Sequence, residues 1–441
     1  MSSPALDVSN AEPEAPEGKL HIQGVPLLYF AILLAVVAVA VYTEVLPHNL
    51  ATGMAVTMVI GGALNYIGTL FPAFGMFGGG PILCLIVPAV LLYFGLVPES
   101  FGEMSSHLFN ETGFSDLVVV GIVVGSLLGM SKSLLIKVGV RFFVPMVAGM
   151  ATALVVGYVV GTITGIGGGN AVMLIVGPAM AGGIAAGVVP MSEIYAAQTG
   201  GDAGGYLEQL TPIVILANFV CILFAGVLNG LGKKVRHPLF SGEGRMLRRN
   251  DQTLKASTSG LPVTLRSVTI GVFISGAVYV LGLVLAAAVP SVHMYIWVIL
   301  IVVALKMFNL LPDFMQMGAE AWSDFITYAL TPSVLVALSA GLMDIDAILS
   351  VVVNPTYLVT IVCVVLAAAI GAGVAGLLIG FYFVESSISA GLAMADMGGS
   401  GDLALLSASG RMHLIPFLQI ATRLGGLLML VVASALAPIF L

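Results

Sequence analysis

Residues 391–426 combine an apolar composition with four charged side chains and a glycine-rich turn. The charged residues are Asp396, Asp402, Arg411 and Arg423, and the turn is Gly398-Gly399-Ser400-Gly401. Charges and irregular backbone are costly at membrane depth and are tolerated where they are buried in protein or line a polar cavity. The fork of donors on a guanidinium suits a carboxylate, and the exposed N–H groups of a glycine turn can cradle an anion. This segment is therefore the candidate binding site.

The composition of the whole chain is that of a membrane protein. Of its 441 residues, 59% are hydrophobic and 8% charged, and the mean hydropathy is +1.11. Soluble domains carry about 25% charged residues. We therefore predict an all-α polytopic membrane protein. Apolar runs that approach or exceed the length of a membrane span predict eleven spans, at 25–42, 51–70, 81–97, 117–130, 142–163, 211–231, 267–289, 294–311, 326–342, 351–382 and 414–441.

The charge distribution predicts the orientation of the chain. Residues 1–20, rich in Pro, Ser, Ala and Glu, are predicted to be a disordered cytoplasmic tail. The loop 232–266 holds eight of the fifteen Lys and Arg residues, so the positive-inside rule places it in the cytoplasm. Six predicted spans precede this loop and five follow it. This count places the N-terminus in the cytoplasm and the C-terminus outside a bacterial inner membrane.

Two apolar stretches broken by Gly and polar residues, 171–198 and 385–409, resemble each other. Both run Ala-Met-Ala, then Gly-Gly, then a short apolar stretch to Ser. Five spans lie between them, which inverts their orientation. Inverted repeats with a broken helix in each half are typical of secondary transporters, whose site lies where the breaks meet. The first half would be 21–231 and the second 267–441. The alternative is chance similarity of two Gly- and Ala-rich helices.

The sequence resembles the 2-hydroxycarboxylate transporter family, whose members include sodium-coupled citrate and malate symporters. The residues that carry the resemblance are 380–391, 398–402, 406–408, 411–412, 419–420 and 423–426, with 190–195 and 199–200 in the first half and 232–234 and 241–245 in the loop. The resemblance implies a homodimer. Each protomer would hold a dimerisation domain and a transport domain with two re-entrant helical hairpins, and the transport domain would move in an elevator-like step.

The resemblance also implies which residues bind substrate and ions. It assigns the substrate to Arg423, Gly399, Ser400, Gly401, Met397, Gly183, Ile184 and Ala185. It assigns one sodium ion to Met394, Asp396, Ser400 and Thr422. It assigns a second, mainly through backbone carbonyls, to Ala179, Gly182, Ile184 and Ala393. Asp402 and Glu193 would support these sites or cap the hairpins, and a structural ion pair of Arg423 with Asp396 or Asp402 is the alternative to substrate binding.

Three positions depart from the pattern of the citrate carriers. Met397 stands where those carriers have a second substrate arginine, Asp396 where they have asparagine, and Ile184-Ala185 where they have Asn-Gly. The first two changes make the pocket two charge units more negative. A smaller acid such as malate is therefore favoured over citrate. Asp396 also leaves proton coupling open as an alternative to one sodium ion.

Other function classes remain to be weighed. Exchange of a substrate for a metabolic product fits as well as symport. The membrane subunit of a sodium-pumping decarboxylase also has broken helices and intramembrane carboxylates, although it would not need Arg423. No Ser-His-Asp, Cys-His or ATP-binding pattern is present, so we expect a transporter and not an enzyme.

Three charged residues outside the candidate pocket receive structural interpretations. Arg411 is predicted to snorkel to the membrane interface. Lys306 is predicted to anchor its span at the interface. Glu385 is predicted to act as a helix-terminal group at the start of the second broken stretch.

Overall fold

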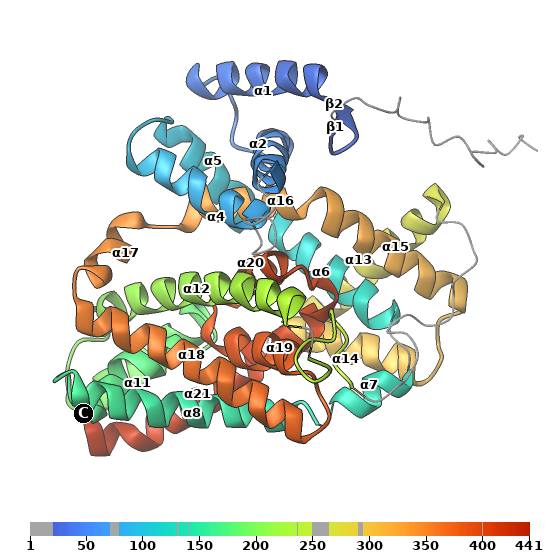
Figure 1. The fold of residues 1–441 in the computed structure, drawn as a ribbon. Coiled ribbons are helices and arrows are strands. Elements are labelled where there is room, and N and C mark those ends of the chain that lie inside the picture. Colours follow the sequence, from blue (N-terminus) through green and yellow to red (C-terminus); the bar gives the residue numbers. More distant parts are fainter. Residues whose placement is uncertain are drawn as a thin grey trace, which may run out of the picture.

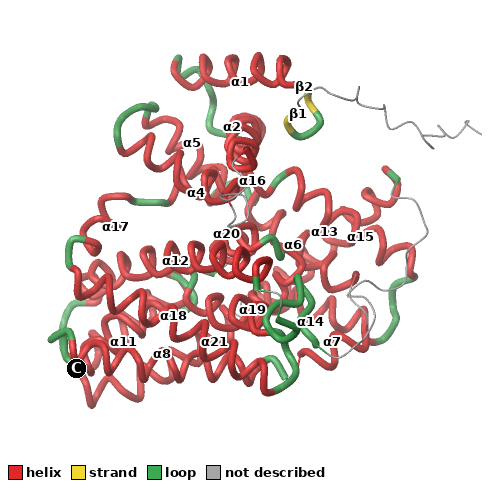
Figure 2. Tube along the Cα trace, viewed as in Figure 1, coloured by secondary structure: helices red, strands yellow, loops and turns green. Residues whose placement is uncertain are grey.

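The computed structural model describes residues 21–70, 79–129, 132–139, 141–235, 237–248, 264–289, 294–398 and 400–441. Helices make up nearly all of this part of the chain (Figure 2). Within it, the only sheet is a two-stranded hairpin of β1 (His21–Ile22) and β2 (Val25–Pro26), in which His21 pairs with Pro26. The predicted tail 1–20 and residues 236 and 249–263 of the basic loop lie outside the described residues. The all-α class predicted from composition is confirmed.

The helices before the basic loop are α1 (Leu27–Tyr42), α2 (Leu50–Leu70), α4 (Gly79–Tyr93), α5 (Glu99–Asn110), α6 (Phe114–Gly129), α7 (Lys132–Gly139), α8 (Phe143–Ile163), α9 (Gly168–Ala171), η1 (Val172–Val176), α10 (Gly177–Ala179), η2 (Ile184–Val188), α11 (Val189–Thr199) and α12 (Ala203–Lys234). Those after it are α13 (Leu265–Ala288), α14 (Met294–Met307), α15 (Asp313–Ala329), α16 (Thr331–Leu342), α17 (Ile345–Val352), α18 (Pro355–Leu378), α19 (Phe383–Ser386), η3 (Ser387–Gly391), η4 (Leu392–Ala395), α20 (Ser400–Ser409), η5 (Met412–Leu414) and α21 (Ile415–Phe440).

Six helices are long and apolar enough to cross a membrane: α2, α8, α12, α13, α18 and α21 with its preceding turn. Two bent pairs, α5 with α6 (45°) and α15 with α16 (50°), raise the number to eight in the described residues. The other three predicted spans correspond to α1, α4 and α14, of 16, 15 and 14 residues. These helices rise about 21–24 Å, less than the roughly 30 Å of a bilayer core. The predicted eleven spans therefore require these short helices to cross as well.

Proline explains two differences between predicted and observed helix boundaries. The predicted span 326–342 is the second half of a bent pair, whose break at Leu330 precedes Thr331-Pro332. The predicted span 351–382 begins instead at Pro355, after Asn354 caps α18 by accepting a hydrogen bond from the Thr356 N–H. Proline is favoured in the first turn of a helix and disfavours helical backbone at the residue before it.

The helices pack as two groups. The flanking group is α2, α4, α5, α6, α13, α14, α15 and α16, and the broken-helix group is α8, α12, α18, α21 and the two segments 168–199 and 383–409 with η5. Figure 1 shows α8, α11, α12, α18 and α21 side by side, with α13, α14 and α15 to their right. The two groups meet mainly through α20 and α21, which contact α4, α6, α14 and α16.

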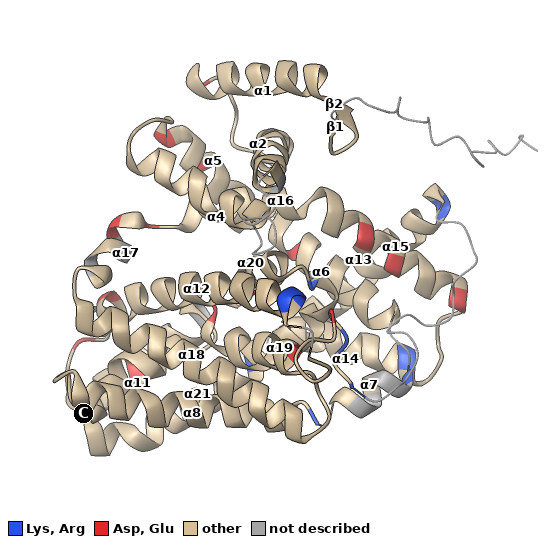
Figure 3. Ribbon diagram, viewed as in Figure 1, with Lys and Arg blue, Asp and Glu red and all other residues tan. Residues whose placement is uncertain are grey.

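Small residues allow the broken-helix group to pack closely. A Cβ atom added at Gly149 of α8 would lie 3.0 Å from the Ala368 carbonyl oxygen of α18. Thr152 donates from Oγ1 to the Ala367 carbonyl oxygen at 2.9 Å, which satisfies a hydroxyl that lipid could not. Charged residues are sparse along these helices and gather at helix ends and loops (Figure 3). The charged residues that are buried are therefore the exceptions to explain.

Candidate functional site

Both Gly-rich segments are helices interrupted near their middle. In the first, 168–199, helical backbone stops at Ala179 and resumes at Ile184 after Gly182 and Gly183, whose φ angles are +74° and +111°. In the second, 383–409, it stops at Ala395 and resumes at Ser400, with Gly398 at φ +68°. Glycine adopts these left-handed conformations without the strain that a Cβ atom would cause. The glycines thus explain where each helix breaks.

The two breaks lie against each other and against α21. A Cβ atom added at Gly183 would lie 2.3 Å from the Met397 carbonyl oxygen, and one at Gly182 would lie 2.3 Å from that of Thr422. One added at Gly398 would lie 2.9 Å from Thr422 Cγ2. The chain halves therefore converge within van der Waals distance of Thr422, beside Arg423. Gly399 lies outside the described residues, and the side chains of Ser400 and Ala185 are not described, so their roles stay predictions.

We expect Gly183→Ala to disrupt the meeting point of the breaks. Alanine at this position would have to adopt a φ of +111°, and its methyl group would overlap the Met397 carbonyl oxygen. Strain of this kind costs about 1–3 kcal/mol. Thermal unfolding of the purified protein measures the loss. The matched control is Gly276→Ala in α13, where nothing lies within 4 Å of the added atom. Equal stability of the two variants would contradict the close approach of the breaks.

Arg423 follows Thr422 on α21 and lacks the partners of a structural ion pair. Its Nε atom is buried and has no hydrogen-bond acceptor, and its guanidinium carbon lies 5.4 Å from the centre of the Tyr295 ring. In the part of the chain that the structure describes, no ion pair joins it to Asp396 or Asp402. The alternative of a structural salt bridge is thus not supported. The guanidinium retains donor capacity for an incoming carboxylate.

Next to Arg423, several buried oxygen atoms lie close together around the Thr422 hydroxyl. Thr422 Oγ1 lies 2.9 Å from Asp402 Oδ1, 3.0 Å from the Ala393 carbonyl oxygen and 2.9 Å from that of Leu418. A hydroxyl has a single proton to share among these acceptors. Such a set of backbone, hydroxyl and carboxylate oxygens suits a hard cation.

Asp396 adds a second buried carboxylate to this oxygen cluster. It is fully buried, as is Asp402, and the two carboxyl groups lie within interaction distance of each other. Asp396 Oδ1 accepts the Gly398 N–H at 2.7 Å, whereas Oδ2 receives no hydrogen bond. An unpaired carboxylate oxygen in a dry site is costly. A bound cation would remove that cost.

The structure brings residues predicted for the two sodium ions together at Thr422. Thr422 and Asp396, predicted for one ion, lie with Ala393, which was predicted for the other. The Met394 side chain points toward Gly425, since its sulfur would lie 2.6 Å from a Cβ atom there. Ala179, Gly182 and Ile184 belong to the first broken segment, and of these the Gly182 backbone approaches Thr422.

Sequence reasoning missed Asn218, Cys221 and Gln419. Asn218 of α12 accepts the Met397 N–H at 3.2 Å, and Cys221 donates to the Ala395 carbonyl oxygen at 3.3 Å. Gln419 donates from Nε2 to Asp402 Oδ2 at 2.8 Å. Asn218 was detectable as the amide in the middle of the predicted span 211–231. These side chains hold the second break in place.

The interpretation of Arg411 as a snorkelling residue was wrong. Its side chain is 4% exposed, and its Nε lies 3.0 Å from Glu385 Oε1. Glu385, itself fully buried, also accepts the backbone N–H groups of Gly242 and Gly244 at 2.9 Å. Glu385 therefore binds the central loop through its carboxylate, in addition to standing near the start of the second segment. A buried carboxylate explains why this arginine turns inward.

The interpretation of Lys306 as an interface anchor was also wrong. Its side chain is buried, and Nζ donates to the Leu128 carbonyl oxygen at 2.5 Å and to Gln316 Oε1 at 2.6 Å. It joins α14 to α6 and α15 inside the flanking group. The sequence gave no signal of these contacts, because the partners of Lys306 belong to other helices.

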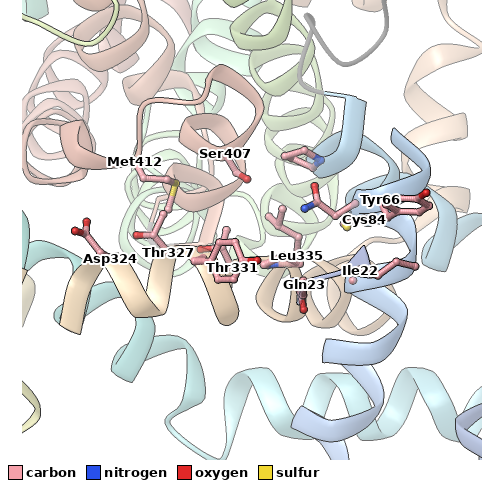
Figure 4. A pocket seen from close by; sticks show the side chains of 15 residues that line it. Ile22, Gln23, Tyr66, Cys84, Asp324, Thr327, Thr331, Leu335, Ser407 and Met412 are labelled. Atoms are coloured by element: carbon pink, nitrogen blue, oxygen red, sulfur yellow. The ribbon is translucent and has the colours of Figure 1, made fainter. Parts of the chain in front are cut away.

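Two hollows lie between the helix groups. The first, of about 440 Å³, has Ser407 and Met412 along one side and Asp324, Thr327 and Thr331 along another (Figure 4). The second, of about 510 Å³, shares Asp324, Thr327 and Met412 with it. Neither is lined by Arg423. A third hollow, of about 590 Å³, lies between α8 and α18 within the broken-helix group, so hollows are not confined to the interface between the groups.

The protein has many helices suited to a membrane, and a broken helix from each half meets the other beside an arginine that can bind a carboxylate. These features together define a secondary transporter. Comparison with known proteins gives the family. The 2-hydroxycarboxylate transporter family matches residues 22–435, and the chain belongs to this family. The resemblance read from the sequence is thereby confirmed, and the protein is a multi-pass membrane protein.

Several characterised relatives are similar along almost their entire length. A citrate/sodium symporter of Salmonella typhimurium is 33% identical over 423 residues, covering 94% of each chain. A citrate transporter of Leuconostoc mesenteroides, CitP, is 32% identical over 419 residues, covering 95% of this chain and 94% of its own. A Na(+)-malate symporter of Bacillus subtilis is 32% identical over 419 residues, covering 94% of this chain and 92% of its own.

Proposed function

We propose that the protein carries a small 2-hydroxycarboxylate across the bacterial inner membrane, coupled to sodium ions, with a malate-like dicarboxylate favoured over citrate. The observation that carries this proposal is Arg423, whose buried Nε has no acceptor and which stands beside both helix breaks. A substrate carboxylate would supply that acceptor through a charge-assisted bond. The names of the relatives, which specify citrate or malate, support the substrate class.

The charges at the site favour a dicarboxylate. Arg423 is balanced by two buried acids, Asp396 and Asp402, and the partly exposed Met397 brings no side-chain donor to the second break. A tricarboxylate would add up to three negative charges to a site with one cationic side chain. With Arg423, the two acids and two proposed sodium ions the site carries one positive charge, so a dicarboxylate leaves one negative charge in excess and a tricarboxylate two. Citrate should therefore bind more weakly than malate.

The oxygen cluster around Thr422 supports sodium as the coupling ion. Asp402 Oδ1 and the Ala393 carbonyl oxygen lie 2.9 and 3.0 Å from Thr422 Oγ1, and Asp396 lies near Asp402. Binding there would place a positive charge next to the substrate position, so that each ligand strengthens the binding of the other. We propose two sodium ions, the second using carbonyl groups near Gly182.

The packing of the chain in two groups supports an elevator-like step. The broken-helix group holds every proposed ligand of substrate and sodium, so it can carry them as a unit. The hollows along its boundary with the flanking group offer room for relative movement. We extend the proposal to a homodimer joined through the flanking groups, with the N-terminus cytoplasmic and the C-terminus outside. Cross-linking and light scattering in detergent test the dimer.

Uptake into liposomes by the purified protein alone tests the function. We expect labelled malate to enter under an inward sodium gradient at fixed pH, and to enter faster than citrate at equal concentration. Citrate uptake at least as fast would contradict the dicarboxylate preference. Uptake driven by a pH gradient without sodium would show that protons, and not sodium ions, are the coupling ions. Counterflow without any ion gradient would indicate exchange, and a requirement for soluble subunits would indicate a decarboxylase complex.

A further inference from the structure

A polar cluster in the flanking group faces Arg423 and has no role in the function proposed so far. Asp116 lies in the first turn of α6, Tyr279 in α13 and Tyr295 at the start of α14. Tyr295 donates its phenol proton to Asp116 Oδ1 at 2.5 Å, and Tyr279 donates to Oδ2 at 3.1 Å. Each carboxylate oxygen thus receives a phenol hydrogen. The bond from Tyr279 holds the Asp116 carboxylate, and the bond from Tyr295 to that carboxylate fixes the position of the Tyr295 hydroxyl.

The ring held in this way lies under the guanidinium of Arg423. The distance from the guanidinium carbon to the ring centre is 5.4 Å, within the range of a cation–π contact. A guanidinium stacked on a ring presents its face to the ring and leaves its edge for hydrogen bonds to a carboxylate. The two interactions are compatible. The Nε atom on that edge has no acceptor in the described residues.

We propose that Tyr295, oriented by Asp116, is a positioning residue for substrate binding: it fixes the plane of the Arg423 guanidinium so that its edge faces the substrate carboxylate. This inference rests on the proposed function, in which Arg423 binds the substrate. Tyr295 itself need not touch the substrate. A guanidinium fixed in plane loses less conformational freedom when it forms two parallel hydrogen bonds.

The location of the pair adds a directional consequence. Tyr295 belongs to the flanking group and Arg423 to the broken-helix group, so an elevator-like movement of one group past the other would separate the two residues. When the broken-helix group moves, Arg423 leaves the ring. The substrate is therefore bound more tightly on the side of the membrane at which the two residues meet.

Transport kinetics in both directions test this inference. Uptake of labelled malate is measured with the full-length protein in right-side-out and in inside-out vesicles. We expect Tyr295→Leu to raise KM in one direction by roughly two- to thirtyfold, the range that a cation–π contact represents, and to leave KM in the other direction unchanged. Tyr295→Phe keeps the ring, so its KM should lie between that of Tyr295→Leu and that of the unaltered protein. The KM of Asp116→Asn, which leaves both phenols an uncharged acceptor, should lie in the same range.

The controls separate positioning from a general loss of structure. Tyr29→Leu, at an exposed tyrosine of α1, should change neither KM. Equal changes in both directions, or none in Tyr295→Leu and Tyr295→Phe, would overturn the inference. If Tyr295→Leu does not fold, Tyr295→Phe alone decides. If Tyr295→Leu changes neither KM while Arg423→Ala abolishes uptake, this inference fails and the proposed function stands. If the unaltered protein takes up neither malate nor citrate, the proposed function fails as well.

Discussion

Arg423→Ala should abolish the rise in thermal stability that malate gives the purified protein in the presence of sodium. A ligand stabilises the folded state in proportion to its affinity, so the shift reports binding directly. Removing one partner of a buried, hydrogen-bonded charge pair costs about 2–5 kcal/mol, or roughly thirty- to several-thousandfold in affinity. Arg423→Lys keeps the charge but not the planar fork, and should retain a small part of the shift.

The matched control for this experiment is Arg266→Ala. Arg266 is an exposed arginine in the first turn of α13, so its loss should leave the malate-induced shift intact. The unliganded Arg423→Ala protein should lose no more than the contact with Tyr295, about 0.5–2 kcal/mol, because Arg423 makes no ion pair in the described residues. A full malate shift in Arg423→Ala would place the substrate site elsewhere.

The second large effect concerns the buried pair of Glu385 and Arg411. Replacing Arg411 by Met leaves the Glu385 carboxylate fully buried without its cation, which costs about 3–5 kcal/mol. Glu385→Gln should cost a similar amount by leaving Arg411 uncompensated. The double variant should recover part of the loss, because neither charge remains. Chemical or thermal unfolding in detergent measures the free energies for this double-mutant cycle.

An exposed pair provides the comparison. His107 and Glu111 lie 3.4 Å apart at the end of α5, with side-chain exposures of 31% and 69%. Glu111→Gln should cost less than about 1 kcal/mol, as exposed ion pairs do. Destabilisation of the same size at both pairs would show that Glu385 and Arg411 are more hydrated than their burial indicates.

Much of the fold and of the candidate site follows from local sequence patterns. Glycine doublets at 182–183 and 398–399 predict the breaks, because few other residues adopt a positive φ without strain. A guanidinium in an apolar run predicts a binding group at Arg423, since the membrane makes an unpaired charge costly. Both inferences need no knowledge of distant residues. The family pattern then relates the two breaks to one another.

Contacts between distant elements could not be predicted in this way. Arg411 was placed at the membrane surface because its neighbours in sequence, Ser409-Gly410, resemble a loop; its carboxylate partner is 26 residues away. Lys306 is explained by a carbonyl group 178 residues away. The support of the second break by Asn218 depends equally on how α12 packs. Each of these depends on tertiary packing, for which one sequence carries no local signal.

The short helix α17 bears on how the two groups can move. It packs on α12 and α18 of the broken-helix group, and only Met343 and Asp344 separate its first residue from the end of α16 in the flanking group. Three Cα–Cα steps reach about 10–11 Å at most. If the broken-helix group moves as proposed while α17 stays on α12, this connection would limit its displacement relative to the end of α16 to about that reach. A longer movement along the membrane normal would require α17 to separate from α12.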